Sequence, residues 1–307
     1  MDFRRANRAY LYMILATIGL VLVVSLWYLN GGFFLNILIN NVISETMILI
    51  PAVAAVLYSG EKLSVLIPFH KIRPSSVFLT FVYIIALFPV VAFVNYVSML
   101  FVENSVTAIA DDVLDMPMWA MILSIGIFGP FVEEIVFRGV ILQSYQRTGR
   151  IIGSILLSSV MFGMMHMNFN QFAYGTVMGI MLALLVEATG SVLTSFIAHA
   201  FFNTIEVVMM FATGDVIDEA ESTLEGYLDG MNETVADVAY TGYLLVAALI
   251  FAVIAYFIVR KIARNEGRIS FFDEIKNSRK QGYKLITIPL VVSMMISVIY
   301  MLYSATL

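Results

Sequence analysis

The chain has 307 residues, of which 61% are hydrophobic and only 13% carry a charged side chain. A soluble domain of this length would carry about 25% charged residues, so the composition excludes an ordinary soluble enzyme. Cysteine is absent, which excludes both a disulfide framework and a cysteine nucleophile, and the net charge of −5 says little because the charges are segregated between loops.

Apolar runs of about 20 residues recur along the chain, the length that an α-helix needs to cross a bilayer. The runs are continuous rather than alternating, which argues against a membrane β-barrel. We therefore expect an all-α polytopic membrane protein with about eight to nine transmembrane helices. The first run is too long for a signal-peptide core, so we expect it to be a retained helix. The candidate spans are 10–29, 36–58, 77–101, 117–142, 151–168, 171–188, 191–212, 239–259 and 285–304.

Loop charge predicts the orientation of these spans, because lysine and arginine concentrate on the cytoplasmic side. With nine spans, every Lys and Arg outside a span lies on the side of the N-terminus, whereas the segment 215–237 is acidic and contains no Lys or Arg. We expect a cytoplasmic N-terminus, an external C-terminus, and a solvated external connector or short helix at the acidic segment. The basic residues outside the spans are Arg4, Arg5, Arg8, Lys62, Lys71, Arg73, Arg147, Arg150, Arg260, Lys261, Arg264, Arg268, Lys276, Arg279, Lys280 and Lys284.

The fourth span contains the sequence FVEEIVFRGV at 131–140, which places three charged side chains within six residues. Each would cost about 2.5–3.5 kcal/mol at the bilayer centre if it had no partner. Glu134 and Arg138 have the helical spacing at which a carboxylate and a guanidinium meet, so we expect a structural pair. The alternative for Arg138 is that it extends to the inner surface. Glu133 lies about 100° around the helix, without a local cation, and suits a general base.

Two further spans carry polar residues at helical spacings. The fifth contains FGMMH at 162–166, and the seventh contains HAFFNTIE at 199–206, in which the polar residues share one helical face. Counted from the expected boundaries, Glu133, His166 and His199 lie at intermediate depth. Three helices are therefore expected to place polar side chains near one level of the bilayer.

Each of these residues also has a plainer explanation. A single histidine inside a membrane often hydrogen-bonds to a neighbouring helix, and Asn203 could serve only to bridge helices. Glu45, Glu187 and Glu206 show no equally specific pattern, so we expect structural roles for them. Two glutamates, two histidines and an asparagine at helical spacings nevertheless favour a site.

The sequence excludes several hydrolase designs that work inside membranes. It contains no His-Glu-x-x-His zinc motif, no Gly-x-Ser-Gly and no Gly-x-Gly-Asp. A base that activates water directly remains. Glu133 would take a proton from a water held between it and His166, and His199 with Asn203 would donate hydrogen bonds to the oxyanion.

Three sequences, EEIVFR at 133–138, FGMMH at 162–166 and HAFFN at 199–203, resemble the motifs of the CAAX protease and bacteriocin-processing family. The family pattern is Glu-Glu-x-x-x-Arg, Phe-x-x-x-His and His-x-x-x-Asn, in that order. Each motif is short, but the three in order, each in its own span, form a specific pattern. The resemblance covers about residues 117–210.

The family consists of intramembrane glutamate-dependent endopeptidases. The resemblance implies that Glu133 is the catalytic base and His166 its partner, on the fourth and fifth spans. It implies that His199 and Asn203, on the seventh span, form the oxyanion site.

Structural roles follow from the same resemblance for Glu134, Arg138 and Phe162. We accordingly divide the chain into N-terminal membrane helices (1–116), a catalytic core (117–212), and an acidic external loop with C-terminal membrane helices (213–307).

The resemblance implies a peptide or lipidated-peptide substrate, contact with membrane lipids, and no cofactor, metal or nucleic acid. We expect the plasma membrane of a bacterium or archaeon, and the sequence leaves the oligomeric state open. Two alternatives also remain open. One is a zinc-dependent protease that uses Glu133, His166 and His199 as ligands. The other is a non-catalytic binding or immunity protein, or a carrier that uses its buried charges as a pathway.

Overall fold

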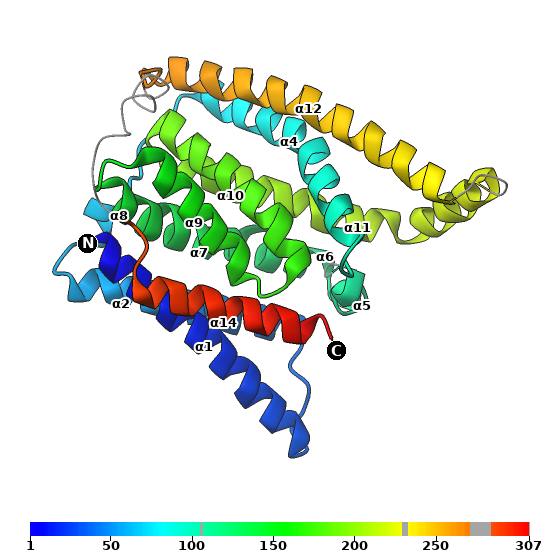
Figure 1. Cartoon of the computed structure of the whole chain (residues 1–307), viewed down its shortest axis with the longest axis horizontal. Helices are drawn as coiled ribbons and strands as arrows, with labels where there is room; N and C mark the ends of the chain where they lie inside the picture. Colours follow the sequence, from blue (N-terminus) through cyan, green and yellow to red (C-terminus); the bar gives the residue numbers. More distant parts are fainter. Residues whose placement is uncertain (105–106, 229–232, 271–283, 307) are drawn as a thin grey trace.

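The computed structural model describes residues 1–104, 107–228, 233–270 and 284–306, and these residues form helices without any strand. Figure 1 shows the helices running roughly alongside one another, with the green segment from α7 to α10 in the middle of the bundle. The described part of the chain is therefore an all-α bundle, as the composition predicts.

Seven of the described helices are long and apolar enough to cross a membrane, which confirms the expected polytopic all-α class. Two further apolar helices, α9 (Ile151–Met165) and α14 (Ile288–Ser304), are shorter than this. Each of the nine expected spans corresponds to one of these apolar helices. The seven long ones are α1 (Phe3–Leu29), α2 (Ile37–Tyr58), α4 (Pro74–Met99), the helix Met118–Gln146, α10 (Phe169–Thr189), Val192–Ala212 of α11 and Asp237–Asn265 of α12.

The helix Met118–Gln146 consists of five segments that follow one another without a break: α6 (Met118–Met121), η2 (Ile122–Phe128), α7 (Gly129–Glu134), η3 (Ile135–Ile141) and α8 (Leu142–Gln146). Both η2 and η3 are wide, π-helical stretches. They flank α7, which ends with the two adjacent glutamates. Such wide turns occur often at functional sites because they change the direction in which side chains point.

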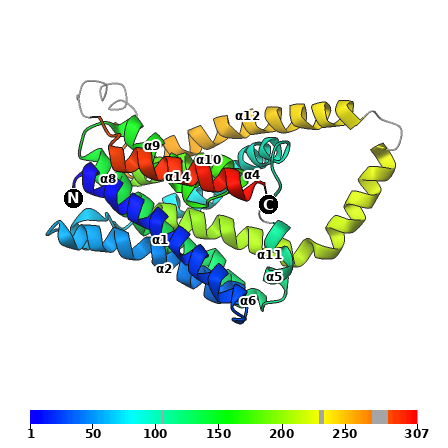
Figure 2. The ribbon, with the colours of Figure 1, turned by 60° about the horizontal axis from the view of Figure 1, so that its bottom comes forward.

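The acidic segment, for which we expected a connector or a short helix, has a largely helical backbone. Helix α11 runs from Val192 to Leu228, and α12 from Glu233 to Asn265. Residues 229–232 lie outside the described ones, and the external position of the segment stays a prediction. The segment contains four glutamates and no proline, so it can continue the helix past its apolar part. The two helices approach each other at the right of Figures 1 and 2.

Two hydrophobic clusters hold the bundle together. One joins α1, α2, η3, α9 and α14, and the other joins α4, α10, α11 and α12. Helices α4 and α12 pack against each other along the top of Figure 1, and α1 packs against α2 and α14 at the bottom. The green helices between them contribute to both clusters, so the centre of the bundle is shielded on two sides.

Helices α9 and α10 form a hairpin with an unusually close backbone approach. A Cβ atom on Gly163 would lie 2.7 Å from the carbonyl oxygen of Phe172 and 2.4 Å from Thr176 Oγ1. One on Gly179 would lie 3.0 Å from the Cα of Ser159. Small residues allow this packing, as they commonly do between membrane helices. The hairpin fixes the position of the residues at its turn.

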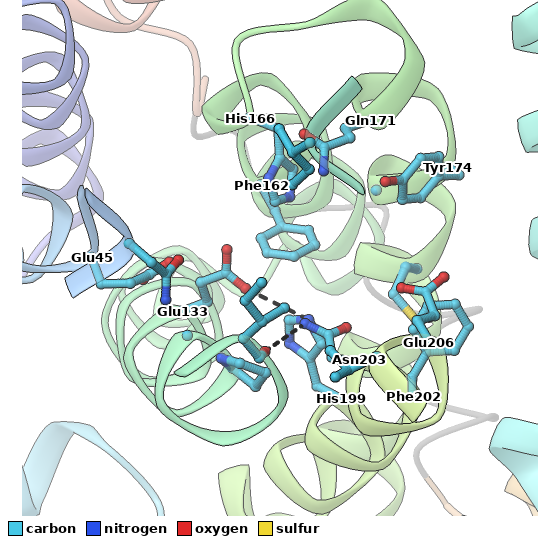
Figure 3. A pocket seen from close by; sticks show the side chains of 18 of the residues that line it. Glu45, Glu133, Phe162, His166, Gln171, Tyr174, His199, Phe202, Asn203 and Glu206 are labelled. Atoms are coloured by element: carbon cyan, nitrogen blue, oxygen red, sulfur yellow. Dashed lines mark hydrogen bonds and ion pairs between the residues drawn. The ribbon is translucent and has the colours of Figure 1, made fainter. Parts of the chain in front are cut away.

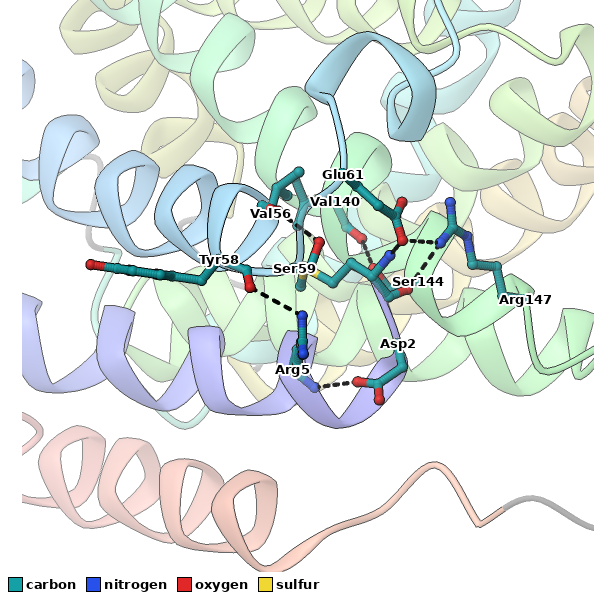
Figure 4. A network of polar contacts seen from close by, with 10 residues as sticks. Asp2, Arg5, Val56, Tyr58, Ser59, Glu61, Val140, Ser144 and Arg147 are labelled. Carbon is teal, nitrogen blue, oxygen red and sulfur yellow. Dashed lines mark hydrogen bonds and ion pairs between the residues drawn. The ribbon is translucent and has the colours of Figure 1, made fainter.

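A polar network joins the N-terminal segment, the chain after α2 and the chain after α8 (Figure 4). Arg147 Nη1, after α8, lies 2.7 Å from Glu61 Oε1, which also pairs with the amino group of Met1. Arg5 Nη1 donates to the carbonyl oxygen of Tyr58 at 3.3 Å. Short α3 (Leu63–Leu66) belongs to the same end of the molecule. This clustering is what the loop-charge argument requires, and the membrane side on which it lies stays a prediction.

The other end carries the small elements η1 (Thr107–Ile109) and α5 (Ala110–Leu114), which precede the helix Met118–Gln146. Val113 of α5 is buried against Met121 and Val207, so this segment closes over the ends of α6 and α11. The apolar contact holds an otherwise acidic segment, which contains Asp111 and Asp112, against the bundle.

Candidate active site

A cavity of about 230 Å³ lies within the bundle, where α7, α9, α10 and α11 face α2 (Figure 3). Its wall includes four of the residues singled out from the sequence: Glu133, His166, His199 and Asn203. They come from three helices that are far apart along the chain. The structure therefore brings the candidate catalytic residues to one place.

Glu134 and Arg138 form the ion pair that their spacing predicts. Arg138 Nη1 lies 2.8 Å from Glu134 Oε1, and both side chains are almost fully buried. Arg138 Nη2 also donates to the carbonyl oxygen of Gly179 at 3.3 Å, and its guanidinium carbon lies 4.2 Å from the centre of the Phe162 ring. The guanidinium is thus held by a carboxylate, a backbone carbonyl and an aromatic face, and it does not extend to the surface.

The two adjacent glutamates have different surroundings. The side chain of Glu134 is 1% exposed and points at Arg138, whereas that of Glu133 is 13% exposed and lines the cavity. Successive helical residues point about 100° apart, so only one of the two can face the cavity. The geometry assigns the ion pair to Glu134 and leaves Glu133 at the cavity wall.

His199 bridges the two glutamates, which the sequence analysis did not predict. Its Nδ1 lies 3.0 Å from Glu134 Oε1, and its Nε2 lies 3.5 Å from Glu133 Oε2. A carboxylate that is paired with Arg138 accepts hydrogen bonds, so Nδ1 must carry the hydrogen. Nε2 can then donate only when the imidazole is doubly protonated. The expected oxyanion role of His199 depends on that charge state.

His166 lies at the end of a helix, and its expected intermediate depth in the bilayer stays a prediction. It is the C-cap of α9, and Met167 after it has a left-handed backbone with φ of 57°. The amide of Asn168 donates to the carbonyl oxygen of His166 at 2.9 Å. With 15 residues, α9 is about 22 Å long, so it stops short of a full crossing and ends beside the cavity.

Aromatic contacts fix the orientation of both histidines. The Phe162 ring lies edge-on to His166, with 5.2 Å between the ring centres, and edge-on to His199, with 5.7 Å. Gly175 packs against His166, since a Cβ at that glycine would lie 3.3 Å from His166 Cδ2. Phe162, expected to have a structural role, thus separates and orients the two imidazoles (Figure 3).

Asn203 lies one turn after His199 on α11 and also lines the cavity. Its Nδ2 donates to the carbonyl oxygen of Ile125 at 3.2 Å, within the π-helical stretch η2. This bond holds the amide in place and uses one of its two hydrogens. An oxyanion role requires the second hydrogen.

Several cavity residues were missed by the sequence analysis. Glu45 and Glu206, for which we expected structural roles, both line the cavity, together with Asn41, Gln171 and Tyr174. A sequence signal existed for some of them. Glu206 continues the polar face of α11, and Asn41 with Glu45 forms an i, i+4 polar pair inside an apolar span.

Glu187 lies elsewhere. The side chain of Arg268 donates to its backbone carbonyl at 2.9 Å, and Glu187 is not part of the cavity wall. The described residues contain no group of three or more His, Asp or Glu side chains arranged to hold a metal ion. Chemically, the cavity offers three carboxyl groups and two imidazoles around a space large enough for water molecules.

Comparison with known proteins finds similarity in the segment that carries this site. Residues 115–205 match the family described as "Type II CAAX prenyl endopeptidase Rce1-like". The protein described as "Putative membrane peptidase YdiL" from Bacillus subtilis (strain 168) is 35% identical over 108 residues, which are 35% of this chain and 43% of that relative. The match thus spans less than half of the relative's length, and no solved structure matches the chain. The three motifs lie in order along the matched segment, so this part of the chain is similar to the CAAX prenyl endopeptidase family.

Proposed function

We propose that the protein is an intramembrane endopeptidase that hydrolyses a peptide bond with a water activated by Glu133, without a metal ion. The observation that carries this proposal is the meeting of Glu133, His166 and His199 at one cavity inside an apolar bundle. The description of the family as prenyl endopeptidases supports it. Burying charged side chains in a membrane costs free energy, and a catalytic role would explain why these residues are present there.

In the proposed reaction, the Glu133 carboxylate takes a proton from a water held between it and His166. The water oxygen then attacks the carbonyl carbon of the substrate. General base catalysis of this kind contributes typically about 10²–10⁴-fold to a rate. Phe162, in contact with His166, keeps that imidazole turned toward the cavity.

The oxyanion that forms on the carbonyl is stabilised by His199 and Asn203. Glu134 and Arg138 act through His199: the carboxylate accepts from Nδ1 and fixes which ring nitrogen faces the cavity. With the Nδ1 hydrogen donated to Glu134, Nε2 donates to the oxyanion in the doubly protonated form of the imidazole. Loss of one oxyanion donor typically costs about 2.7–4 kcal/mol of transition-state stabilisation.

The substrate in this proposal is an extended peptide or the terminus of a lipidated chain. A water takes up about 30 Å³ of liquid volume, so a cavity of about 230 Å³ accepts the groups around one peptide bond and not a folded domain. The substrate must therefore present an unfolded segment to the bundle.

The test is peptide cleavage by the purified protein in lipid nanodiscs. A mixture of synthetic peptides, half of them carrying a C-terminal prenyl cysteine, is incubated with the protein, and new termini are identified by mass spectrometry. We expect Glu133→Gln to reduce cleavage at least about 100-fold, because the amide cannot take the proton from water. Glu103→Gln makes the same chemical change at an exposed residue outside the cavity and should keep full activity.

Two outcomes would contradict this mechanism. Equal cleavage by Glu133→Gln and the unmodified protein would remove Glu133 from the reaction. Loss of cleavage on treatment with a chelator, with recovery on adding Zn²⁺, would replace the metal-independent step by metal-assisted hydrolysis. We expect the chelator to leave the rate unchanged.

A further inference from the structure

Helix α2 contributes two polar residues to the cavity, one turn apart on the same face. The Asn41 side chain donates from Nδ2 to Ser124 Oγ at 2.9 Å and to the Ser124 carbonyl oxygen at 3.3 Å, which ties α2 to η2. Glu45 follows four residues later and also lines the cavity. The contact of Asn41 with η2 therefore fixes the position of Glu45 along the cavity wall.

Glu45 reaches the cavity on the side where Glu133 lies (Figure 3). Its Oε1 lies 3.5 Å from the position that a Cβ on Gly129 would occupy, and Gly129 is one helical turn before Glu133 on α7. The absence of a side chain at Gly129 lets the second carboxyl approach the same face of α7.

The second oxygen of this carboxyl is without a partner in the protein. Glu45 Oε2 is buried and makes no hydrogen bond within the described residues. An unpartnered buried oxygen costs about 1–3 kcal/mol, more when it is charged, so its presence at a cavity wall calls for a functional explanation.

The groups that face Glu45 across the cavity include no lysine or arginine among the described residues of its wall. The titratable ones are Glu133 from α7, His166 from α9, Tyr174 from α10, and His199 and Glu206 from α11. Among them His199 is already engaged by both Glu133 and Glu134. Two carboxyl groups that line one cavity repel each other when both are charged, which favours a proton on one of them.

We propose that Glu45 is a second catalytic residue, a proton donor to the leaving nitrogen of the scissile bond. The proposal rests on the peptidase function proposed above. Glu133, held beside His199, is the carboxylate, and Glu45, with no cation beside it at the cavity wall, carries the proton. Glu45 and Glu133, both at the cavity wall, then have the different protonation states that an acid and a base require.

The proposed reaction transfers two protons and breaks one carbon–nitrogen bond. The Glu133 carboxylate takes one proton from water while the water oxygen forms a bond to the carbonyl carbon. The carbon–nitrogen bond of the tetrahedral intermediate breaks, and the nitrogen leaves as an amine with the proton from Glu45. The proton on Glu133 then passes to the Glu45 carboxylate and restores both groups. The sum is one water and one amide consumed, one carboxylic acid and one amine formed.

Replacing the scissile amide by an ester tests the step, because an ester oxygen needs less protonation to leave than an amide nitrogen. The probe is a peptide cleaved in the library experiment, resynthesised with an ester at the same bond. We expect Glu45→Gln to slow the amide at least about 100-fold and the ester less than about 10-fold. Glu133→Gln should slow both, since each reaction needs activated water.

Two further variants separate this role from a general effect of charge. Glu206→Gln removes a carboxylate from the same cavity on α11, and it should keep the amide-to-ester ratio of the unmodified protein. Glu187→Gln removes a carboxylate outside the cavity, and its amide cleavage should be unchanged. Equal losses on amide and ester in Glu45→Gln, or no loss on either, would overturn the proposal.

A measurement that needs no activity covers the case in which the peptidase function itself fails. The infrared carbonyl band of protonated carboxyl groups should be weaker in Glu45→Gln than in the unmodified protein in nanodiscs, and the difference spectrum should show the lost band. Glu187→Gln provides the matched comparison. An unchanged band would show that Glu45 holds no proton and would overturn the donor role, whether or not peptides are cleaved. Absence of cleavage with the band assigned to Glu45 would instead count against the peptidase function alone.

Discussion

At the scale of single residues, the site depends on the different surroundings of three charged side chains, Glu133, Glu134 and Arg138, within about one helical turn. Glu134 forms an ion pair with Arg138 and lies 3.0 Å from His199 Nδ1, whereas the Glu133 carboxylate lines the cavity. The spacing of Glu134 and Arg138 predicted their pairing, because i, i+4 contacts are local. The bridge through His199 joins residues 65 and 66 positions apart, and nothing in the local pattern could reveal it.

The buried pair should be far more important for stability than an exposed one. Removing one partner of a buried ion pair costs about 3–5 kcal/mol, because the other charge is left uncompensated. We expect Arg138→Ala to lower the unfolding temperature in detergent strongly and to reduce the yield of folded protein.

Arg147 provides the comparison. Its side chain is 44% exposed and pairs with Glu61, which is 29% exposed. Exposed pairs contribute about 0–1 kcal/mol, so Arg147→Ala should change the unfolding temperature little. An equal loss of stability in both variants would contradict this account. If Arg138→Ala were normally stable but did not cleave peptides, the ion pair would have a role in the reaction and not in stability.

At the scale of elements, the α9–α10 hairpin positions His166. The short α9 ends beside the cavity, and the glycines at 163, 175 and 179 let the two helix backbones approach. The sequence predicted both helices but extended the first one to residue 168. Helix ends depend on capping and on contacts with neighbours, which is why the expected and observed boundaries differ by a few residues.

The close approach predicts a marked effect of a single methyl group. In Gly163→Ala, the new Cβ would lie 2.7 Å from the carbonyl oxygen of Phe172, a backbone atom that cannot turn aside. The two helices must separate, which should lower the unfolding temperature and shift His166. We expect reduced cleavage as well as reduced stability.

The same substitution at Gly242 is the matched control. A Cβ at Gly242, within α12, would meet nothing within 4 Å. Alanine is favoured over glycine inside a helix by roughly 0.5–1 kcal/mol, so Gly242→Ala should be neutral or slightly stabilising. A Gly163→Ala protein as stable as Gly242→Ala would refute the tight-packing explanation.

At the scale of the whole molecule, charge is divided between two ends. The contacts of Glu61 with Arg147, and of the Arg73 backbone with Glu266, gather basic loops at one end. Asp111 and Asp112 lie in α5 at the other. The positive charges favour the cytoplasmic side, because translocation of such loops is disfavoured.

The absence of native cysteine allows a direct test of this orientation. Single cysteines are introduced at two exposed positions, Lys62→Cys at the basic end and Asp112→Cys at the acidic end. A membrane-impermeant maleimide added to intact cells should label only Cys at position 112, and permeabilised cells should show labelling at both. Labelling of position 62 in intact cells would show that the orientation is the opposite of the one predicted.

The sequence by itself determined the class of the molecule and the identity of the motif residues. Continuous apolar runs allow only helices in a bilayer, because every backbone polar group must be satisfied within its own segment. The i, i+4 pair of Glu134 and Arg138 followed from the same local geometry. For the acidic segment, the sequence left both a connector and a short helix open, because acidity and helix propensity are compatible and charge alone does not distinguish the two.

The tertiary structure decided what surrounds the candidate catalytic carboxylate. Only the packing of α2 against α7 brings Glu45 toward Glu133, and only the fold of α11 places His199 against both glutamates. Such contacts depend on helix rotation and on the side chains between the helices, and a rotation of one residue, about 100°, would point each group elsewhere. A pattern along one chain fixes which face of a helix is polar, and packing between helices decides which polar faces meet.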